Sequence, residues 1–227
     1  AAHAALRRFA LGQLGSDDDR MAALYNLQAS GGVQPGERFM MWINDAWEEI
    51  QPPNFTIRAS YDHPSYRARV SKLLDEASAF LAEGNGDDAI PLLRQAIALE
   101  PKALSAYNNL ASVLSASGDK EGSRKLLEQA LAIDPNYLYV RVNLALGAMD
   151  EDTQAAVDYL APLESVTNFA VDEFAFYQYA LGRLAMRVGD TETAQRHLAM
   201  GLAINPDYEP ALDLMSTFDP GDVFANR

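Results

Sequence analysis

Few side chains in this chain could do chemistry, and their spacing builds no reactive site. Of 227 residues none is Cys, and the only imidazoles are those of His3, His63 and His197. A zinc hydrolase of the His-Glu-x-x-His type needs two imidazoles one helical turn apart with a Glu base between them, and no His here begins that motif. We therefore expect no enzyme activity, no catalytic residues, no metal ion, no cofactor and no disulfide or thiolate chemistry.

Three consecutive acids, Asp17, Asp18 and Asp19, could in principle hold a cation. They lack the spaced ligands and the central Gly of a calcium loop. They follow Gly15 and Ser16, an order typical of a helix stop followed by an N-cap and an acidic first turn. The sequence therefore favours capping over metal binding, with helices on both sides of this run.

Charge is distributed unevenly along the chain, whose net value is −14. Residues 1–70 carry 7 basic and 8 acidic groups, whereas residues 71–227 carry 11 and 24. A surface of that sign repels phosphate backbones, so we expect a protein or peptide partner, preferably a basic segment, and no nucleic acid. No run of about 18 apolar residues is present, so we expect no membrane span.

The start of the chain, Ala1-Ala2-His3, has neither a Met nor the pattern of a signal peptide. This suggests a processed chain or a fragment of a longer one. We expect a soluble protein and favour the cytoplasm over the periplasm, and the oligomeric state stays open.

A repeat with a period of 34 residues organises the middle of the sequence. Gly84 recurs as Gly118, Ala96 as Ala130, and Pro101 as Pro135. Each copy reads as an amphipathic helix, a Gly-centred turn, and a second helix that ends in Ala-x-x-acid-Pro. The predicted helices cover residues 66–83, 87–99, 103–116 and 120–133.

This period and pattern resemble the tetratricopeptide repeat (TPR) over residues 64–218. The resemblance implies a mostly α fold, a right-handed TPR α-solenoid of about four helix-turn-helix repeats. A short insertion is expected in the third repeat around residues 165–172, and residues 209–218 should form a capping helix. A small α+β region, residues 1–63, would precede the solenoid, and residues 219–227 would form a C-terminal tail.

Residues 37–59 contain three β-rich runs separated by turn residues. They favour a small antiparallel meander with Asn44-Asp45 at a hairpin tip. The alternative is one helix over residues 37–50, because its apolar residues also recur at helical spacing. In either case Trp42 and Trp47 are expected in the core of this element.

In TPR proteins the first helix of each repeat lines a concave groove. The resemblance therefore implies a scaffold or adaptor, a protein–protein interaction module that binds a peptide or partner helix there. An alternative stays open for the aromatic positions, which could pack between helices. The wall-facing residues assigned to partner binding are Asn108, Tyr139, Val142, Phe176, Tyr179, Arg183 and Arg187.

Residues 15–70 are similar to the non-catalytic tail of Ste24/BepA-type zinc metallopeptidases. The similarity rests on Asp19-Arg20 opening a helix, a Gly-rich interruption, and His63-Pro64 leading into the repeats. It implies an alternative function as the substrate-recruiting or regulatory tail of a bacterial zinc metallopeptidase. The catalytic motif itself is absent from this sequence.

Overall fold

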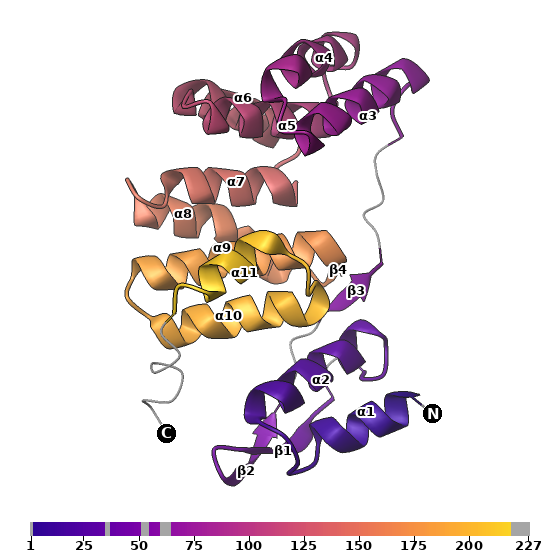
Figure 1. Ribbon diagram of the computed structural model, residues 1–227, viewed down its shortest axis with the longest axis vertical. Helices are drawn as coiled ribbons and strands as arrows, with labels where there is room; N and C mark the ends of the chain where they lie inside the picture. Colours follow the sequence, from indigo (N-terminus) through magenta and orange to yellow (C-terminus); the bar gives the residue numbers. More distant parts are fainter. Residues whose placement is uncertain (1, 35–36, 51–54, 60–64, 219–227) are drawn as a thin grey trace. The chain divides into compact units, whose positions relative to one another are not determined.

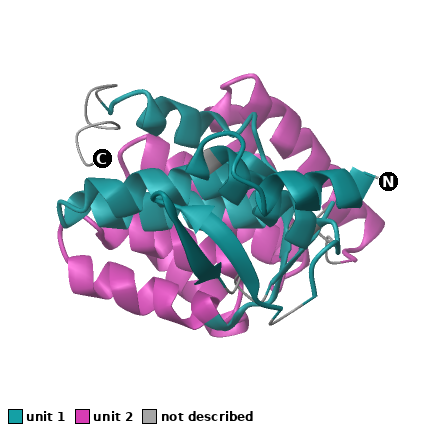
Figure 2. Ribbon diagram, turned by 90° about the horizontal axis from the view of Figure 1, so that it is seen from below, with its two compact units in different colours: residues 1–61, 165–227 teal, residues 62–164 magenta. Residues whose placement is uncertain are grey.

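The computed structural model describes residues 2–34, 37–50, 55–59 and 65–218. The chain forms two compact units (Figure 2): unit 1 joins residues 1–61 to residues 165–227, and unit 2 holds residues 62–164. The first boundary lies next to the one expected after residue 63. The second falls within the stretch expected to form one solenoid, and the expected tail, residues 219–227, lies outside the described residues.

Unit 2 consists, over its described part, of consecutive helix pairs (Figure 1). Every two helices that follow one another in this unit pack against each other. The first four helices agree with the predicted ranges to within two residues at each end, so this part of the prediction is confirmed. The helices are α3 (Ala68–Ala82), α4 (Gly86–Leu99), α5 (Leu104–Ala116), α6 (Lys120–Ile133), α7 (Leu138–Ala148) and α8 (Thr153–Leu160).

The turns inside the first two pairs depend on glycine. Gly84 and Gly118 have φ angles of +77° and +92°, in the left-handed region that other residues avoid. The Asn85 N–H donates to the Phe80 carbonyl at 2.8 Å, a backbone hydrogen bond typical of the end of a helix. The chain then reverses its direction. The 34-residue recurrence of Gly is thus a requirement of the turn.

The core of unit 2 is built from small and branched side chains on facing helices. Ala77 of α3, Ala89 and Ala96 of α4 and Ala106 of α5 are fully buried. Their small size lets neighbouring helices approach closely, while leucines and valines fill the space between. The repeated Ala positions therefore mark helix contacts.

Unit 1 combines the two ends of the sequence. Helix α9 packs extensively on α10, and α11 contacts both, which makes a fourth helix pair followed by a shorter helix. The N-terminal elements are α1 (Ala2–Ala10), α2 (Asp17–Ala29), β1 (Phe39–Ile43), β2 (Ala46–Ile50) and β3 (Thr56–Arg58); the C-terminal elements are β4 (Asn168–Ala170), α9 (Val171–Arg187), α10 (Thr191–Ile204) and α11 (Glu209–Met215).

Helix α2 also packs against α10, so α2 and α11 both cover α10. Leu198 of α10 is fully buried. The start of α2 follows the capping prediction. Ser16 is the N-cap, its hydroxyl accepts from the Asp19 N–H at 3.1 Å, and the Asp19 carboxylate accepts from the Ser16 N–H at 3.2 Å.

Residues 39–50 form a β-hairpin and not a helix. β1 and β2 are antiparallel, and Trp42 pairs with Trp47. The two turn residues, Asn44 and Asp45, have φ angles of +50° and +60°, as a two-residue hairpin turn requires. The hairpin prediction is confirmed.

The predicted three-stranded meander is wrong, because β3 does not join the hairpin. Instead β3 pairs in parallel with β4, with Ile57 opposite Phe169. β4 comes from the insertion expected in the third repeat, after the short 3₁₀ helix Ala161–Ser165. A parallel pair between strands more than 100 residues apart leaves no local pattern in the sequence, so turn and strand propensities could not reveal it.

Candidate protein-binding surfaces

Four of the predicted groove residues lie in one stripe along α9. Phe176, Tyr179, Arg183 and Arg187 follow one another at intervals of three or four residues, so they share one side of the helix. Phe174 and Tyr177, on the opposite side, are buried. The stripe itself is half-buried, except for the exposed Arg187. We call these four residues the α9 stripe.

Tyr179 and Arg183 are paired within the stripe. The Arg183 Nη1 donates to the Tyr179 hydroxyl at 3.0 Å, and the guanidinium carbon lies 5.9 Å from the centre of the Tyr179 ring. This contact holds the guanidinium against an aromatic surface. The remaining N–H groups of Arg183 keep the donor geometry that suits a carboxylate.

Tyr208, the residue before α11, completes this surface. Its ring meets the Tyr179 ring edge to face, with centroids 6.1 Å apart. Burial raises the pKa of Tyr208 well above its usual value, and the charges of Tyr179 and Asp172 add to the rise. The Tyr208 hydroxyl therefore stays protonated at physiological pH, and the half-buried ring forms an uncharged wall next to Tyr179 and Arg183.

The acids near the start of α9 have partners other than the arginines of the stripe. The buried carboxylate of Glu173 accepts from Arg58 Nη2 at 3.1 Å and from the Ala170 N–H at 2.8 Å. Asp172 accepts from Asn205 at 3.0 Å. Both carboxylates therefore have hydrogen-bond contacts that do not involve Arg183.

The other three predicted residues lie in unit 2. Asn108 of α5 and Asn143 of α7 are joined by a hydrogen bond of 2.9 Å, which links successive first helices. Tyr139 is half-buried and its ring packs against Tyr137. Val142 is fully buried, so its side chain supports α7 and does not face solvent.

The side chain of Arg141 in α7 is also hydrogen-bonded within unit 2. Its guanidinium donates to the carbonyls of Pro135 and Tyr159 at 2.5 and 3.2 Å. These hydrogen bonds therefore link the start of α7 to the end of α8.

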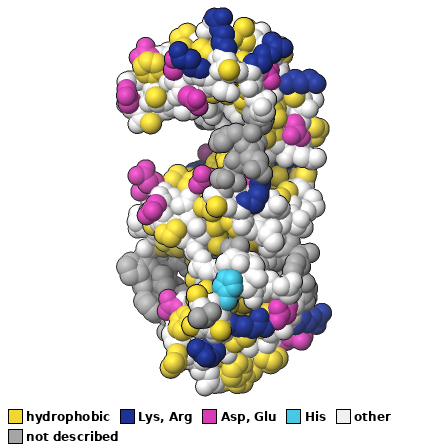
Figure 3. Space-filling view, turned by 90° about the vertical axis from the view of Figure 1, so that its right-hand side faces the viewer, with side chains coloured by type: hydrophobic (Ala, Val, Ile, Leu, Met, Phe, Trp, Pro, Cys, Tyr) yellow, Lys and Arg dark blue, Asp and Glu magenta, His cyan; other side chains and the backbone are white. Residues whose placement is uncertain are grey.

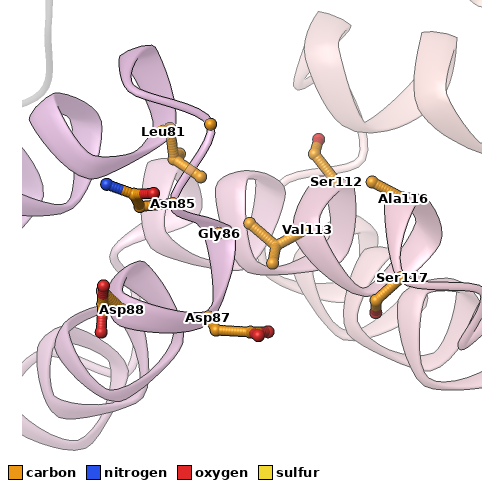
Figure 4. A pocket seen from close by; sticks show the side chains of 10 residues that line it. Leu81, Asn85, Gly86, Asp87, Asp88, Ser112, Val113, Ala116 and Ser117 are labelled. Atoms are coloured by element: carbon orange, nitrogen blue, oxygen red, sulfur yellow. The ribbon is translucent and has the colours of Figure 1, made fainter.

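Unit 2 also contains an open hollow of about 630 Å³ at the turn between α3 and α4. Figure 4 shows Asp87 and Asp88 on the α4 side, and Ser112, Val113 and Ser117 on the α5 side. Only acidic side chains bring charge to this lining. The hollow therefore offers little for an anion and no enclosed cavity for an apolar ligand.

Within the described residues, His, Asp and Glu side chains nowhere gather in the groups of three that a metal ion would need. In the same part of the chain, no helix combines the length and the apolar character needed to cross a bilayer. Arg20, part of the metallopeptidase resemblance, is almost fully buried and donates to the Trp42 carbonyl at 2.7 Å. His63 and Pro64 lie outside the described residues.

The helix pairs, their 34-residue period and their Gly turns define a TPR-type helical repeat. In agreement with this, residues 80–144 match the sequence model of the tetratricopeptide repeat family. A comparison with curated protein sequences gave no significant match.

Among solved structures, the chain is similar to PilF of Pseudomonas aeruginosa, with 18% identity and a TM-score of 0.54. The alignment covers 65% of this chain and 66% of PilF, slightly less than two thirds of its length. A second similar structure is MamA from Desulfovibrio magneticus RS-1, with 12% identity, coverage of 66% and 84%, and a TM-score of 0.48. The likeness to PilF shows a shared fold. Neither these matches nor the described residues support the metallopeptidase-tail hypothesis.

Two contributors to these surfaces were not predicted. Tyr208 follows Pro206 by two residues, as Tyr137 follows Pro135, so the repeat register contained a signal for it. Asn143 was not among the residues assigned to the groove. Its bond to Asn108 depends on the approach of α7 to α5, which the sequence does not give.

Proposed function

We propose that this protein is a non-enzymatic scaffold that binds a peptide or helix of another protein through the first helices of its repeats. The observation that carries the proposal is the α9 stripe together with Tyr208: Tyr179, Arg183 and Tyr208 form a half-exposed aromatic surface with a guanidinium group. Tyr and Arg are enriched among residues that dominate binding energies at protein interfaces. Helical-repeat proteins commonly present such extended surfaces to partners.

The ligand that fits this surface is a short segment with an apolar side chain and a nearby carboxylate. The apolar group would pack on the rings of Tyr179 and Tyr208, and the carboxylate would accept two N–H bonds from Arg183. The exposed Arg187, one turn further along the helix, would attract the same negative charge. In unit 2 the proposed contacts are Asn108 and Tyr139. Val142 is buried and would support them from the core side of α7.

A peptide-display selection on the full chain tests this proposal without knowledge of the natural partner. We expect enrichment of peptides that combine Leu, Phe or Trp with Asp, Glu or a free C-terminus. Each selected peptide should then be retested against Arg183→Ala and against Arg94→Ala, a control that removes an exposed Arg from α4. Selected peptides that bind both variants equally well, or a selection without enrichment, would contradict the proposal.

A further inference from the structure

The β1–β2 hairpin of unit 1 has one face in the core and one face toward solvent. Phe39 and Met41 of β1 are buried against α1 and α2. Side chains alternate along a strand, and residues directly opposite on two paired strands share a face, so Met40, its partner Glu49 and the Trp42–Trp47 pair point the other way. This outer face carries Met40 and Trp47, which are 52% and 49% exposed, and the half-buried Trp42.

The exposed Trp47 corrects the expectation that both tryptophans belong to the core. Trp42 and Trp47 meet edge to face with centroids 5.5 Å apart, so they form a rigid aromatic surface. Figure 3 shows hydrophobic side chains at the lower end of unit 1, on the side where Figure 1 draws α1. Large exposed aromatic groups of this kind are more frequent at interaction sites than on the rest of a protein surface.

The two edges of the hairpin differ. On the β1 edge, the Trp42 carbonyl accepts from Arg20 and the Asn44 N–H donates to Asp17, at 2.7 and 2.8 Å. That edge is thus occupied by the start of α2. Because the Trp42 carbonyl points away from β2, the Trp42–Trp47 pair is one that exchanges no backbone bonds.

The same alternation fixes which backbone groups β2 presents at its other edge. Trp47 and Glu49 both belong to pairs that exchange no bonds, so their N–H and C=O groups point away from β1. Within the described residues, β1 is the only strand that pairs with β2. The β2 edge therefore offers two donors and two acceptors beside an exposed Trp.

The negative charge around this edge favours a basic partner. The segment from Glu37 to Ile50 contains four acids and one basic residue, Arg38, which pairs with Glu49 at 3.1 Å. Glu48 and Glu49 are both exposed. Pairing of two β2 edges from two copies of this chain would bring like charges together, which destabilises a sheet. An extended basic segment meets no such repulsion.

We propose that the β2 edge is a docking site for an extended basic segment of another protein, which adds to the hairpin as a third strand. Its backbone would pair with Trp47 and Glu49. An Arg or Lys opposite Trp47 would lie on the indole face, and one opposite Glu49 would form an ion pair.

The probe for this site is a fluorescein-labelled eight-residue peptide of alternating Val and Arg, titrated with the full chain and followed by fluorescence anisotropy. We expect binding that is lost when the backbone nitrogens of the Arg residues are methylated, because these residues stand opposite Trp47 and Glu49 and methylation removes their N–H donors while keeping the charge. Equal binding of the methylated peptide would overturn the proposal, since it would show attraction by charge alone.

Two pairs of variants localise the binding. Trp47→Ala and Glu49→Lys should each weaken binding of the Val-Arg peptide by about fivefold or more, as expected for anchor residues. The matched controls should change it less than about twofold: Leu212→Ala removes an apolar residue that is 45% exposed, and Glu128→Lys reverses an exposed Glu paired with Arg124. Arg183→Ala should also have no effect. Losses of the same size in the controls would overturn the assignment to the β2 edge.

Discussion

At the scale of single residues, the pairing of Tyr179 with Arg183 gives the α9 stripe its chemical character. A guanidinium held on an aromatic ring loses less conformational freedom when it binds a carboxylate than a free side chain would. The resemblance to the TPR assigned both residues to the groove wall, and their role in binding stays a prediction. The sequence could not show that Tyr208 lies against the Tyr179 ring, because this contact depends on how the chain enters α11.

His197 of α10 provides a prediction about pH. Its Nδ1 lies 2.8 Å from the Gln178 Oε1, and burial, followed by the nearby charge of Arg196, lowers the pKa of the imidazole, with Asp190 opposing the shift. The unfolded chain therefore takes up this proton first as the pH falls. The stabilising contribution is complete above about 6.5 and is lost as the pH falls through that value toward the folded pKa.

We expect the melting temperature to fall between pH 7 and pH 5.5, and to fall less in His197→Gln. The carboxylates with a lowered pKa, such as Asp19 and Asp190, titrate below this window. Thermal melts of both proteins across the window measure the effect. A steeper fall in the variant would mean that His197 is not the group responsible.

At the scale of elements, the first four helices of unit 2 could be predicted because their signals are local. Their Gly turn and Ala contact position recur after 34 residues, and the hairpin turn is likewise encoded in Asn44-Asp45. The pairing of β3 with β4, and of α2 with α10, could not be predicted, because each joins segments that are distant in the sequence. The insertion expected in the third repeat is present, but the sequence did not predict that part of it forms the strand β4.

Glu173 should be the main polar contact that fixes β3 to the start of α9. Its side chain is 8% exposed and accepts from both Arg58 and the Ala170 N–H. Glu173→Ala leaves these donors without their acceptor, so we expect a loss of about 1–3 kcal/mol in the free energy of unfolding. Glu192→Ala, which removes an exposed Glu paired with Arg196, should cost less than about 1 kcal/mol in the same urea titration. Equal costs would contradict this role.

Two glycines inside helices should respond to alanine in opposite directions. A Cβ on Gly182 of α9 would lie 3.0 Å from the Leu198 side chain, whereas a Cβ on the exposed Gly147 of α7 meets nothing within 4 Å. We expect Gly182→Ala to lower the free energy of unfolding by about 1–3 kcal/mol. Gly147→Ala should raise it by about 0.5–1 kcal/mol, because alanine favours the helix. Urea titrations measure both changes, and a stabilised Gly182→Ala would show that α9 and α10 are less closely packed.

At the scale of the whole molecule, the two units differ in how their cores are assembled. The core of unit 2 draws on consecutive helices, whereas unit 1 needs segments from both ends of the sequence, such as Phe55 packed on Phe169 and Phe174. We expect an isolated fragment of residues 62–164 to be helical by circular dichroism and to melt cooperatively. A fragment of residues 1–61 should lack a cooperative transition, because α10, β4 and α9 are missing. A reversed outcome would contradict this division.

The central claim, that the α9 stripe binds a partner, is tested most directly by the affinity of a display-selected peptide measured by isothermal titration calorimetry. We predict that Tyr179→Ala and Arg183→Ala each weaken binding by about 1–3 kcal/mol. Three controls should change it by less than about 0.5 kcal/mol: Ser78→Ala, at an exposed position of α3, Ser112→Ala and Arg94→Ala. The melting temperatures of Arg183→Ala and the wild type should be equal. Unchanged affinity in both Tyr179→Ala and Arg183→Ala would contradict the claim.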